Sequence, residues 1–313
     1  MSALLPPFDF QHVIVDPWTV NLPSTASWML MGFFVTAACG LVGNYLMLRR
    51  MALMGDAVSH SVLPGLVIAF LLTGSRGTGA MFLGALLAGV ATTVIIETIH
   101  RKTRVKTDAS IGVTFTTLFA IGVVLVSIFS SQVDLDAECV LYGEIGFIPP
   151  LSGWGELPVA LLRMGGVLVA VGVLIAVFYK ELLVSSFDSG LARSLGINTT
   201  LVHYGMMTML SLVVVSAFEA VGSILVIAML ILPGATAGLL STRLAVVHGL
   251  SVVHAALSAV LGVHLALALD CQIGPAMVVA GAGLFGLAWV FSPKQGLLRR
   301  WRRPAVLTAE SSV

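Results

Sequence analysis

Charged side chains are scarce in this sequence of 313 residues, in which Asp, Glu, Lys and Arg together make up 10% and hydrophobic residues 58%. A soluble domain carries about 25% charged residues, so this chain has too few of them to cover a surface that faces water. The mean hydropathy of +1.04 agrees. The net charge of +1 also lacks the basic excess with which proteins bind nucleic acid. The composition excludes an ordinary soluble domain and predicts a membrane protein with no nucleic-acid partner.

Sequence signatures of several enzyme classes are absent as well. There is no GxxxxGK[ST] segment to hold the phosphates of ATP, no HExxH of a metalloprotease and no GxSxG of a serine hydrolase. The three cysteines, Cys39, Cys139 and Cys271, lack the CxxC spacing of a zinc or redox site. We therefore expect no catalytic residues and no permanently bound cofactor. Energy for any transport must come from a separate ATPase subunit or from an ion gradient.

Long apolar runs dominate what is present. A helix needs about 20 apolar residues to cross the roughly 30 Å of hydrocarbon in a bilayer. Nine runs of this kind can be marked, at residues 27–48, 52–73, 78–98, 110–130, 159–178, 200–218, 220–240, 245–269 and 273–291. One of them could be short or re-entrant, which leaves eight spans as an alternative. The predicted fold is an all-α polytopic membrane protein of eight to nine transmembrane helices, with its transmembrane domain over residues 27–292.

Basic residues follow every second span. They cluster after the first, third, fifth and seventh spans and again in the tail 293–313, and the positive-inside rule makes these places cytoplasmic. With nine spans, the N-terminal segment 1–26 then lies outside and the C-terminus lies in the cytoplasm. Acidic residues crowd the outer loop 131–158. This loop is either a landing surface for a partner or an ordinary solvated loop.

The stretch GDAVSHSVLPG, residues 55–65, places Asp56 and His60 four residues apart at the start of the second span. Residues at this spacing share one face of a helix. If the helix rises continuously from Arg50, Asp56 lies roughly 9 Å and His60 roughly 15 Å inside the bilayer, where an ionisable group indicates function. A carboxylate and an imidazole suit manganese, iron or zinc, but two ligands are too few, so others must come from another helix or a second subunit. The alternative is that Asp56 caps the helix and His60 is a packing residue.

Glu219 is a second acidic candidate, in the stretch FEAVGSILVIAMLILPGATA between the sixth and seventh spans. An acid in or near the membrane is a candidate functional residue, but a carboxylate between two helix ends can also be simply solvated. Gly222, Pro233 and Gly234 are expected to interrupt the helices there, and Pro64 to loosen the second span. The histidines of spans six to eight are expected not to be metal ligands, namely His203, His248, His254 and His264. Met206, Met207 and Met209 are expected to pack in the core.

Three motifs together carry a resemblance to a known family. GDAVSHSVLPG, FDSGLARSLGI at residues 187–197 and FEAVGSILVIAMLILPGATAGLL at residues 218–240 resemble, in this order, the membrane permease subunit of the manganese, zinc and iron ATP-binding-cassette importers, the ABC-3 family. The resemblance covers most of residues 27–298. It implies a permease bundle that acts as a dimer in a bacterial inner membrane. It also implies that Asp56 and His60 line the translocation path and coordinate the metal.

Partners are implied by the same resemblance. Residues 185–198 would form a cytoplasmic coupling segment that docks on a separate ATP-binding subunit, and ATP would be bound and hydrolysed there rather than by this chain. The residues that carry this role are Phe187, Asp188, Gly190, Ala192, Leu195 and Gly196. The other implied partners are an extracytoplasmic metal-binding protein, a second permease copy or a paralogue, and membrane lipid.

The transported metal is expected to be manganese. The acid before AVG, Glu219, and the ending LALALDCQIGPAM look more like the manganese and iron branch of the family than the zinc branch. Zinc and iron stay as alternatives. Two other classes of protein are alternatives: a proton-driven secondary transporter with Asp56, His60 and Glu219 as a relay, and an intramembrane metalloenzyme. The coupling motif argues against the first and the absent catalytic motifs argue against the second.

Overall fold

The computed structural model describes residues 9–74, 78–129, 145–151, 157–292 and 296. Most of these residues lie in helices, and no strand occurs among them. Nine helices within the described ranges are long and apolar enough to cross a membrane, which confirms the all-α fold and the higher of the two predicted span counts. Most of the outer loop 131–158 and nearly all of the tail 293–313 lie outside the described residues.

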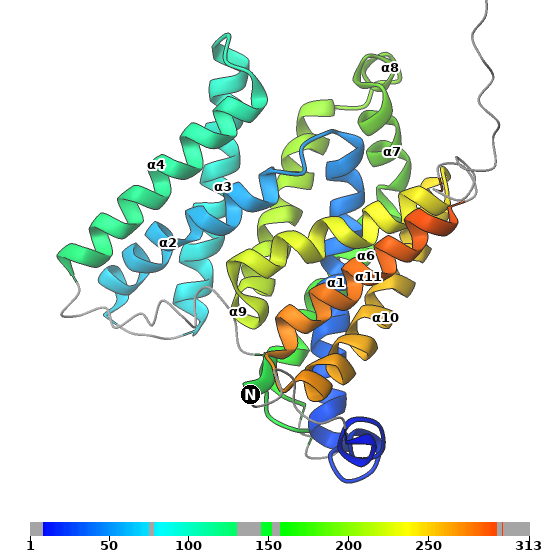
Figure 1. The fold of residues 1–313 in the computed structure, drawn as a ribbon. Helices are drawn as coiled ribbons and strands as arrows, with labels where there is room; N and C mark the ends of the chain where they lie inside the picture. The colour runs from blue at the N-terminus through cyan, green and yellow to red at the C-terminus, as the bar shows by residue number, and fades with distance from the viewer. Residues whose placement is uncertain (1–8, 75–77, 130–144, 152–156, 293–295, 297–313) are drawn as a thin grey trace, which may run out of the picture.

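The helices follow the predicted apolar runs closely (Figure 1). In chain order they are η1 Gln11–Val15, η2 Asp16–Trp18, α1 Leu22–Leu48, α2 Met54–Thr73, α3 Thr78–Lys102, α4 Thr107–Ile128, η3 Ile145–Phe147, α6 Val159–Val177, α7 Tyr179–Phe187, α8 Ser189–Ser194, α9 Thr199–Leu240, α10 Leu244–Leu269 and α11 Ile273–Phe291. Helix α9 contains two of the nine spans, because its backbone leaves the helical conformation at Gly222 and the chain turns back there.

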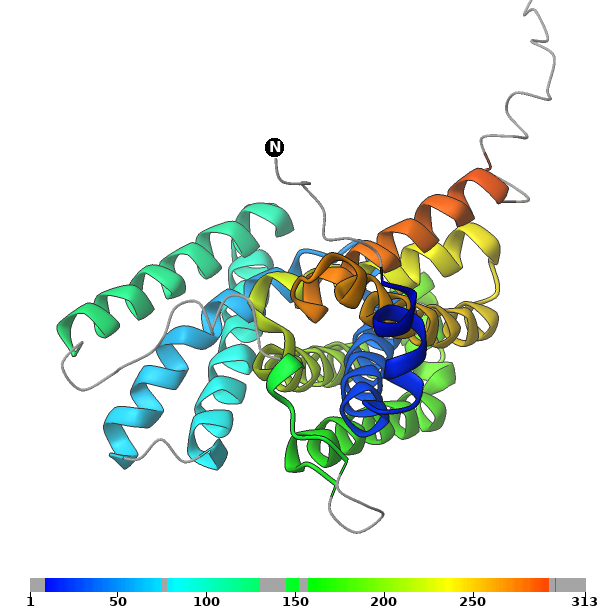
Figure 2. The same cartoon turned by 60° about the horizontal axis from the view of Figure 1, so that its bottom comes forward.

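Two groups of helices stand side by side (Figures 1 and 2). Helices α2, α3 and α4 pack mainly on one another and form what we call the α2–α4 lobe. In the other group, called the core below, α1 contacts α9, α10 and α6, and α11 packs on α10 and α9. The lobe and the core meet where α2 and α3 contact α9.

Close contact between α1 and its neighbours holds the core together. A Cβ added to Gly43 would lie 2.0 Å from the backbone oxygen of Leu230 in α9, so glycine is required for this approach. The adjacent Asn44 donates from Nδ2 to His248 Nδ1 at 2.9 Å and to Ser251 Oγ at 3.1 Å. All three of these side chains are buried. Paired polar groups therefore fasten α1 to α10 within an apolar interior.

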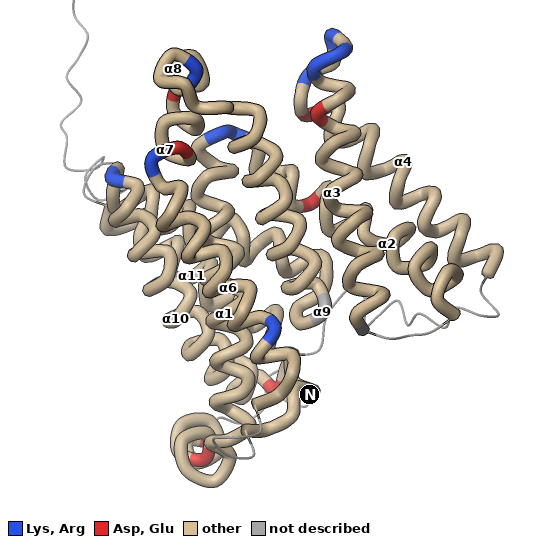
Figure 3. The backbone as a smooth tube through the Cα atoms, turned by 180° about the vertical axis from the view of Figure 1, so that it is seen from behind, with Lys and Arg blue, Asp and Glu red and all other residues tan. Residues whose placement is uncertain are grey.

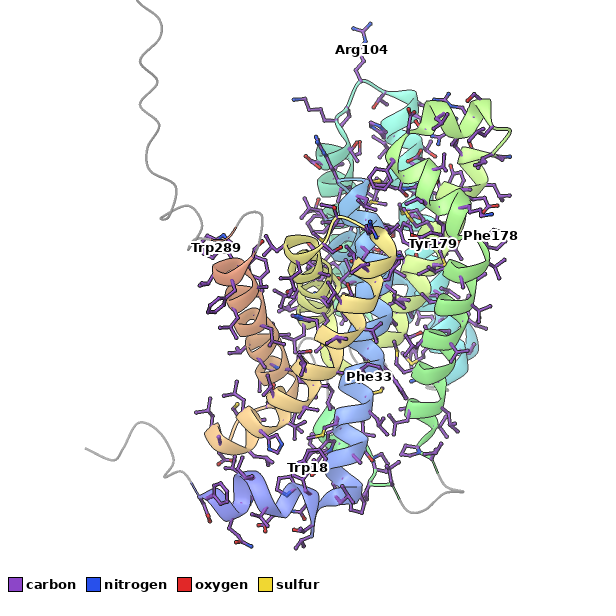
Figure 4. All side chains as sticks on the ribbon, turned by 90° about the vertical axis from the view of Figure 1, so that its right-hand side faces the viewer. Trp18, Phe33, Arg104, Phe178, Tyr179 and Trp289 are labelled. Carbon is purple, nitrogen blue, oxygen red and sulfur yellow. The ribbon has the colours of Figure 1, made fainter. Side chains whose placement is uncertain are left out.

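The segment before α1 crosses the end of the bundle (Figure 4). His264 of α10 holds it in place, because Trp18 Nε1 donates to His264 Nε2 at 3.2 Å and His264 Nδ1 lies 2.8 Å from the carbonyl oxygen of Val13. Since Nε2 accepts, Nδ1 carries the proton and donates to Val13. His264 thus anchors the N-terminal segment to α10.

Two helix starts differ from the prediction. Helix α1 begins at Leu22 rather than at residue 27, because Pro23 lies in the first turn, where no backbone donor is needed. A continuous helix from Arg50 is wrong: Arg50 has a φ of 57° and α2 begins at Met54. The depths derived for Asp56 and His60 from such a helix therefore do not hold. At the end of the molecule where α3 is joined to α4, both helices extend well beyond the start of α2 (Figure 1). The start of α2 is therefore still set back from that end.

Only one of the predicted helix breaks is present in the described backbone of α9. Gly222 has φ 76° and ψ 169°, a conformation open to glycine, and the prediction of a break there is confirmed. At Pro233 and Gly234 the prediction is wrong, since α9 continues through both. Helix α2 likewise continues through Pro64. Membrane helices tolerate proline because neighbouring groups satisfy the freed backbone carbonyl.

Basic side chains gather at one end of the bundle (Figure 3). This basic end comprises the turn between α3 and α4, where Arg104 lies (Figure 4), together with the α7–α8 segment, the residues after α1 and the start of α10. Among the described residues, Arg163 of α6 is the exception. Trp18 and the start of α1 lie at the opposite end.

Candidate functional site

Asp56 and His60 form a direct pair on α2. His60 Nε2 lies 3.1 Å from Asp56 Oδ1, and the two side chains are 26% and 28% exposed. The predicted sharing of one helix face is confirmed. The N-cap of α2 is Leu53, three residues before Asp56, so the interpretation of Asp56 as the capping residue is wrong. Its carboxylate is instead available to the imidazole and to whatever reaches this face of α2.

Aromatic rings of α4 flank the imidazole of His60. The ring of Phe115 stacks on it with centroids 6.0 Å apart, and Phe119 meets it edge-on at 5.8 Å. Ser59, beside the pair, turns its hydroxyl back to the carbonyl oxygen of Asp56 at 2.9 Å. The pair is therefore held by α2 and α4 while part of each side chain stays accessible.

As a metal site, the pair is incomplete. One carboxylate and one imidazole suit manganese, iron or zinc, but such ions take four or more ligands. In the part of the chain that the structure describes, there is no group of three or more His, Cys, Asp or Glu residues that could hold a metal ion. The accessible side chains of Asp56 and His60 can thus contribute to a shell that another molecule completes.

The other acidic candidate, Glu219, lies on the backbone of α9 between its two spans and three residues before the break at Gly222. Its side chain lies outside the described residues. A cavity of about 370 Å³ opens beside this part of α9, at the end opposite the basic end, and its lining includes Ala220, Trp28 and Cys271. The neighbourhood of Glu219 is therefore next to a hollow in the molecular surface.

The histidines of the later spans have structural surroundings. His248 accepts from Asn44, and His264 holds the N-terminal segment. His254 is buried between helices, with its Nε2 3.2 Å from where a Cβ on Gly281 would lie. The predicted packing role of Met206, Met207 and Met209 is also confirmed, since all three are buried in the core.

The segment predicted to couple to a partner forms a short helical hairpin at the basic end (Figure 1). Asp188 is the N-cap of α8 and accepts from the backbone nitrogens of Gly190 at 2.8 Å and Leu191 at 3.0 Å. Gly196 ends the segment with a φ of 80°, which favours glycine. Asp188 and Gly196 thus give the hairpin its shape, and both are exposed, as is Gly190.

Three apolar side chains of this hairpin are exposed, namely Phe187, Leu191 and Leu195. Ala192, by contrast, is fully buried. Leu191 is not among the predicted coupling residues, although its spacing of four from Leu195 places these two on one face at the end of α8. Phe187 ends α7, on the other side of the extended residue Asp188. The hairpin therefore exposes an apolar patch at the basic end of the bundle.

A buried carboxylate that the sequence analysis overlooks lies near the same end. Glu97 of α3 accepts from Arg101, and its Oε2 lies 3.1 Å from His203 Nε2 of α9. Arg49, directly after α1, lies on the other side of His203. Burial lowers the pKa of the Arg49 guanidinium, whereas the charge of Glu97 acts in the opposite direction. Two arginines, a histidine and a glutamate thus meet between the core and the lobe.

Nine long apolar helices among the described residues, with basic side chains gathered at one end of the bundle, define the class: a polytopic membrane protein. Residues 22–292 match the ABC 3 transport family, and the chain belongs to this family. It is thus a permease component of an ABC transporter, as the three motifs predict.

Similar proteins agree with this assignment. The manganese transport system membrane protein MntD of Bacillus subtilis (strain 168) is 44% identical over 282 residues, which are 88% of this chain and 95% of that protein. The zinc transport system membrane protein TroD of Treponema pallidum (strain Nichols) is 40% identical over 280 residues, 88% of this chain and 76% of that protein. The solved structure of PsaBC from Streptococcus pneumoniae in complex with Fab is similar with a TM-score of 0.74 at 32% identity, covering 94% of this chain and all of that chain.

Proposed function

We propose that this chain is the membrane subunit of an ABC importer that moves a divalent transition metal, manganese, into the cytoplasm. The accessible Asp56–His60 pair is the observation that carries the proposal, because it offers ligands of the right chemistry inside a helical bundle. Several relatives are named manganese transport or import proteins. One is named for zinc, so zinc and iron are the alternative substrates.

In this proposal, the metal shell is completed across subunits. Two copies of the chain, or one copy and a paralogue, would bring two carboxylates and two imidazoles to one path. A shell shared between subunits opens when they move apart, so the same residues that select the ion also release it. Binding must be strong enough to admit the ion and weak enough to let it leave.

The two ends of the bundle would receive different partners. The basic end is assigned to the cytoplasm by the positive-inside rule, with the tail 293–313 on the same side. A separate ATP-binding subunit would dock there on the exposed patch of Phe187, Leu191 and Leu195. The N-terminal segment 1–26 and the 370 Å³ cavity would face outward, toward an extracytoplasmic metal-binding protein. Glu219, near this cavity, is a further candidate along the entry path.

Uptake of radioactive manganese by cells that express the whole transporter tests the proposal. The double variant Asp56→Ala, His60→Ala should reach the membrane, assemble with the ATP-binding subunit and take up no manganese above background. The matched control is Asp108→Ala, His100→Ala, which removes the same two kinds of side chain from exposed positions at the basic end. This control should transport like the wild type.

Unchanged uptake by the Asp56, His60 double variant would contradict the proposed role of the pair. Competition then identifies the substrate: if excess zinc or iron suppresses uptake more strongly than unlabelled manganese does, manganese is the wrong metal. Transport by the purified permease alone, without any ATP-binding subunit, would overturn the ABC mechanism in favour of a secondary transporter.

A further inference from the structure

We propose that Arg49, His203 and Glu97 form a polar bridge through which the α7–α8 hairpin positions the Asp56–His60 pair. The inference rests on the proposed function and adds to it a route between the docking hairpin and the metal pair. In this route Glu97 and His203 are positioning residues. Neither of them contacts the metal pair directly.

The first part of the bridge ties α7 to the end of α1. The Arg49 guanidinium donates from Nη2 to Ser185 Oγ at 2.9 Å and from Nε to Ser186 Oγ at 3.1 Å. Both serines lie in the last turn of α7, directly before Phe187 of the exposed patch. Movement of the hairpin therefore acts on a guanidinium whose geometry is fixed by two acceptors.

The second part crosses from α1 to α9 and on to α3. Arg49 Nη1 lies 3.3 Å from His203 Nδ1. Because a guanidinium only donates, Nδ1 must accept, and the proton of the neutral imidazole is then on Nε2. That proton points at Glu97 Oε2, 3.1 Å away. His203 thus has a fixed role at each ring nitrogen: Nδ1 accepts from Arg49, and Nε2 donates to Glu97.

The third part runs along α3 to the metal pair. Thr92, on the same helix as Glu97, donates from its hydroxyl to Ser61 Oγ of α2 at 2.7 Å. Ser61 is the neighbour of His60. One turn further along α2, a Cβ on Gly65 would lie 2.4 Å from the backbone oxygen of Gly84 in α3. The two backbones are therefore in close contact here, and we expect α2 and α3 to move together. A displacement of α3 at Glu97 is therefore carried into the helix that holds His60.

Burial and charge argue against two simpler interpretations. The Glu97 side chain is 10% exposed and that of His203 is 12% exposed, so these groups are not a solvated surface cluster. A second metal site is also excluded by electrostatics, because Arg49 and Arg101 already neutralise Glu97 and would repel a divalent cation. Fully partnered charges between two groups of helices are expected to fix their relative placement.

The test compares two substitutions of one residue. In the reconstituted complex of permease, ATP-binding subunit and binding protein, manganese uptake and ATP hydrolysis are measured together, and their ratio is the readout. His203→Gln keeps one acceptor for Arg49 and one donor for Glu97, whereas His203→Phe keeps a ring and loses both. We expect His203→Phe and Glu97→Gln to lower uptake per ATP about tenfold, as the loss of a charge-assisted hydrogen bond allows, and His203→Gln to stay within about twofold of the wild type.

An uptake-to-ATP ratio of His203→Phe equal to that of the wild type would overturn the bridge while leaving the proposed function intact. Failure of the proposed function looks different, since the wild-type complex itself would then take up no metal. The bridge is tested in that case by thermal unfolding of the purified chain: the effects of His203→Phe and Glu97→Gln must be less than additive, and strictly additive effects contradict it. The same cycle applies if His203→Phe does not assemble.

Discussion

The core and the α2–α4 lobe differ in how much of each helix is enclosed by protein. Of the most apolar 18-residue window of α1, 61% is buried, against 17% for α4. Yet the lobe, not the core, carries the Asp56–His60 pair. Within the lobe, α2, which holds the pair, is 50% buried by the same measure, and the less enclosed helices are its neighbours α3 at 28% and α4 at 17%. The surface that the lobe leaves for lipid or for a second subunit therefore lies mainly on α3 and α4.

The contrast does not extend to packing within each group. Gly43 lets α1 approach α9, and Gly65 lets α2 approach α3, with added Cβ atoms at 2.0 Å and 2.4 Å from backbone oxygens. At the junction of the two groups, a Cβ on Gly89 would lie 3.2 Å from side-chain atoms of Ser211 and Val58. Each group is tightly packed inside, and the contact between them has more room. Substitutions at these three glycines test this difference in packing.

Gly43→Ala should have the largest effect. The added methyl group meets a backbone carbonyl that cannot rotate away, so the core must open, at a cost of about 1–3 kcal/mol or more. Thermal unfolding of the purified protein and its yield in membranes measure this loss. Gly172→Ala in α6, where no described atom lies within 4 Å of the added Cβ, carries the same change in helix propensity and is the control. Equal stability of the two variants would contradict the close α1–α9 contact.

Gly65→Ala comes next, with a similar local clash confined to the lobe. We expect about 1–2 kcal/mol of destabilisation and a loss of metal uptake out of proportion to it, because α2 holds the metal pair. The control Gly112→Ala in α4 has no described atom within 4 Å of its Cβ. Uptake that declines only in step with the amount of folded protein would argue against a link between α2–α3 packing and the pair.

Asn44→Leu should cost about 1 kcal/mol, in the range measured for hydrogen bonds between membrane helices. It leaves His248 and Ser251 without their shared partner between α1 and α10. Thermal unfolding checks the size of the effect, and Ser251→Ala on the Asn44→Leu background should add little. A fully additive second loss would show that the two residues act independently.

Gly89→Ala should have the smallest effect, below about 1 kcal/mol, since the neighbouring side chains can move by the few tenths of an ångström required. Thermal unfolding again provides the measurement. If this variant is as unstable as Gly43→Ala, the junction is packed as tightly as the two interiors, and the distinction between core and lobe fails.

The sequence predicts the spans well because length and hydropathy are local properties of the chain. It also predicts that Asp56 and His60 share a face, since a spacing of four residues is enough for that. It predicts a break between α1 and α2, but not that α2 begins as late as Met54, because no glycine or proline marks the turn in which Arg50 takes up a left-handed conformation. Pro233 misleads in the other direction, because tertiary neighbours support α9 through it.

Glu97 is missed for a different reason. In the sequence it ends an apolar run beside a basic cluster, which is typical of a residue at the membrane surface. Its partner His203 comes from a helix about a hundred residues further on, and Arg49 from one that precedes it. No spacing rule connects positions so far apart. A lone acid within the last turns of an apolar helix is the signal that could have drawn attention to it.

The pairing of Asn44 with His248 and Ser251 also has a consequence for how the protein is made. Asn44 enters the membrane with the first helix, and its partners follow 204 and 207 residues later. At about 5–20 residues per second, synthesis takes roughly 10 to 40 s to reach them. During this interval α1 resides in lipid with an unsatisfied amide and an uncovered glycine face, while α2, α3 and α4 can already pack on one another. A ribosome that stops between α4 and α6 leaves behind a formed lobe and a first helix whose main partners, α6, α9 and α10, have not yet been made.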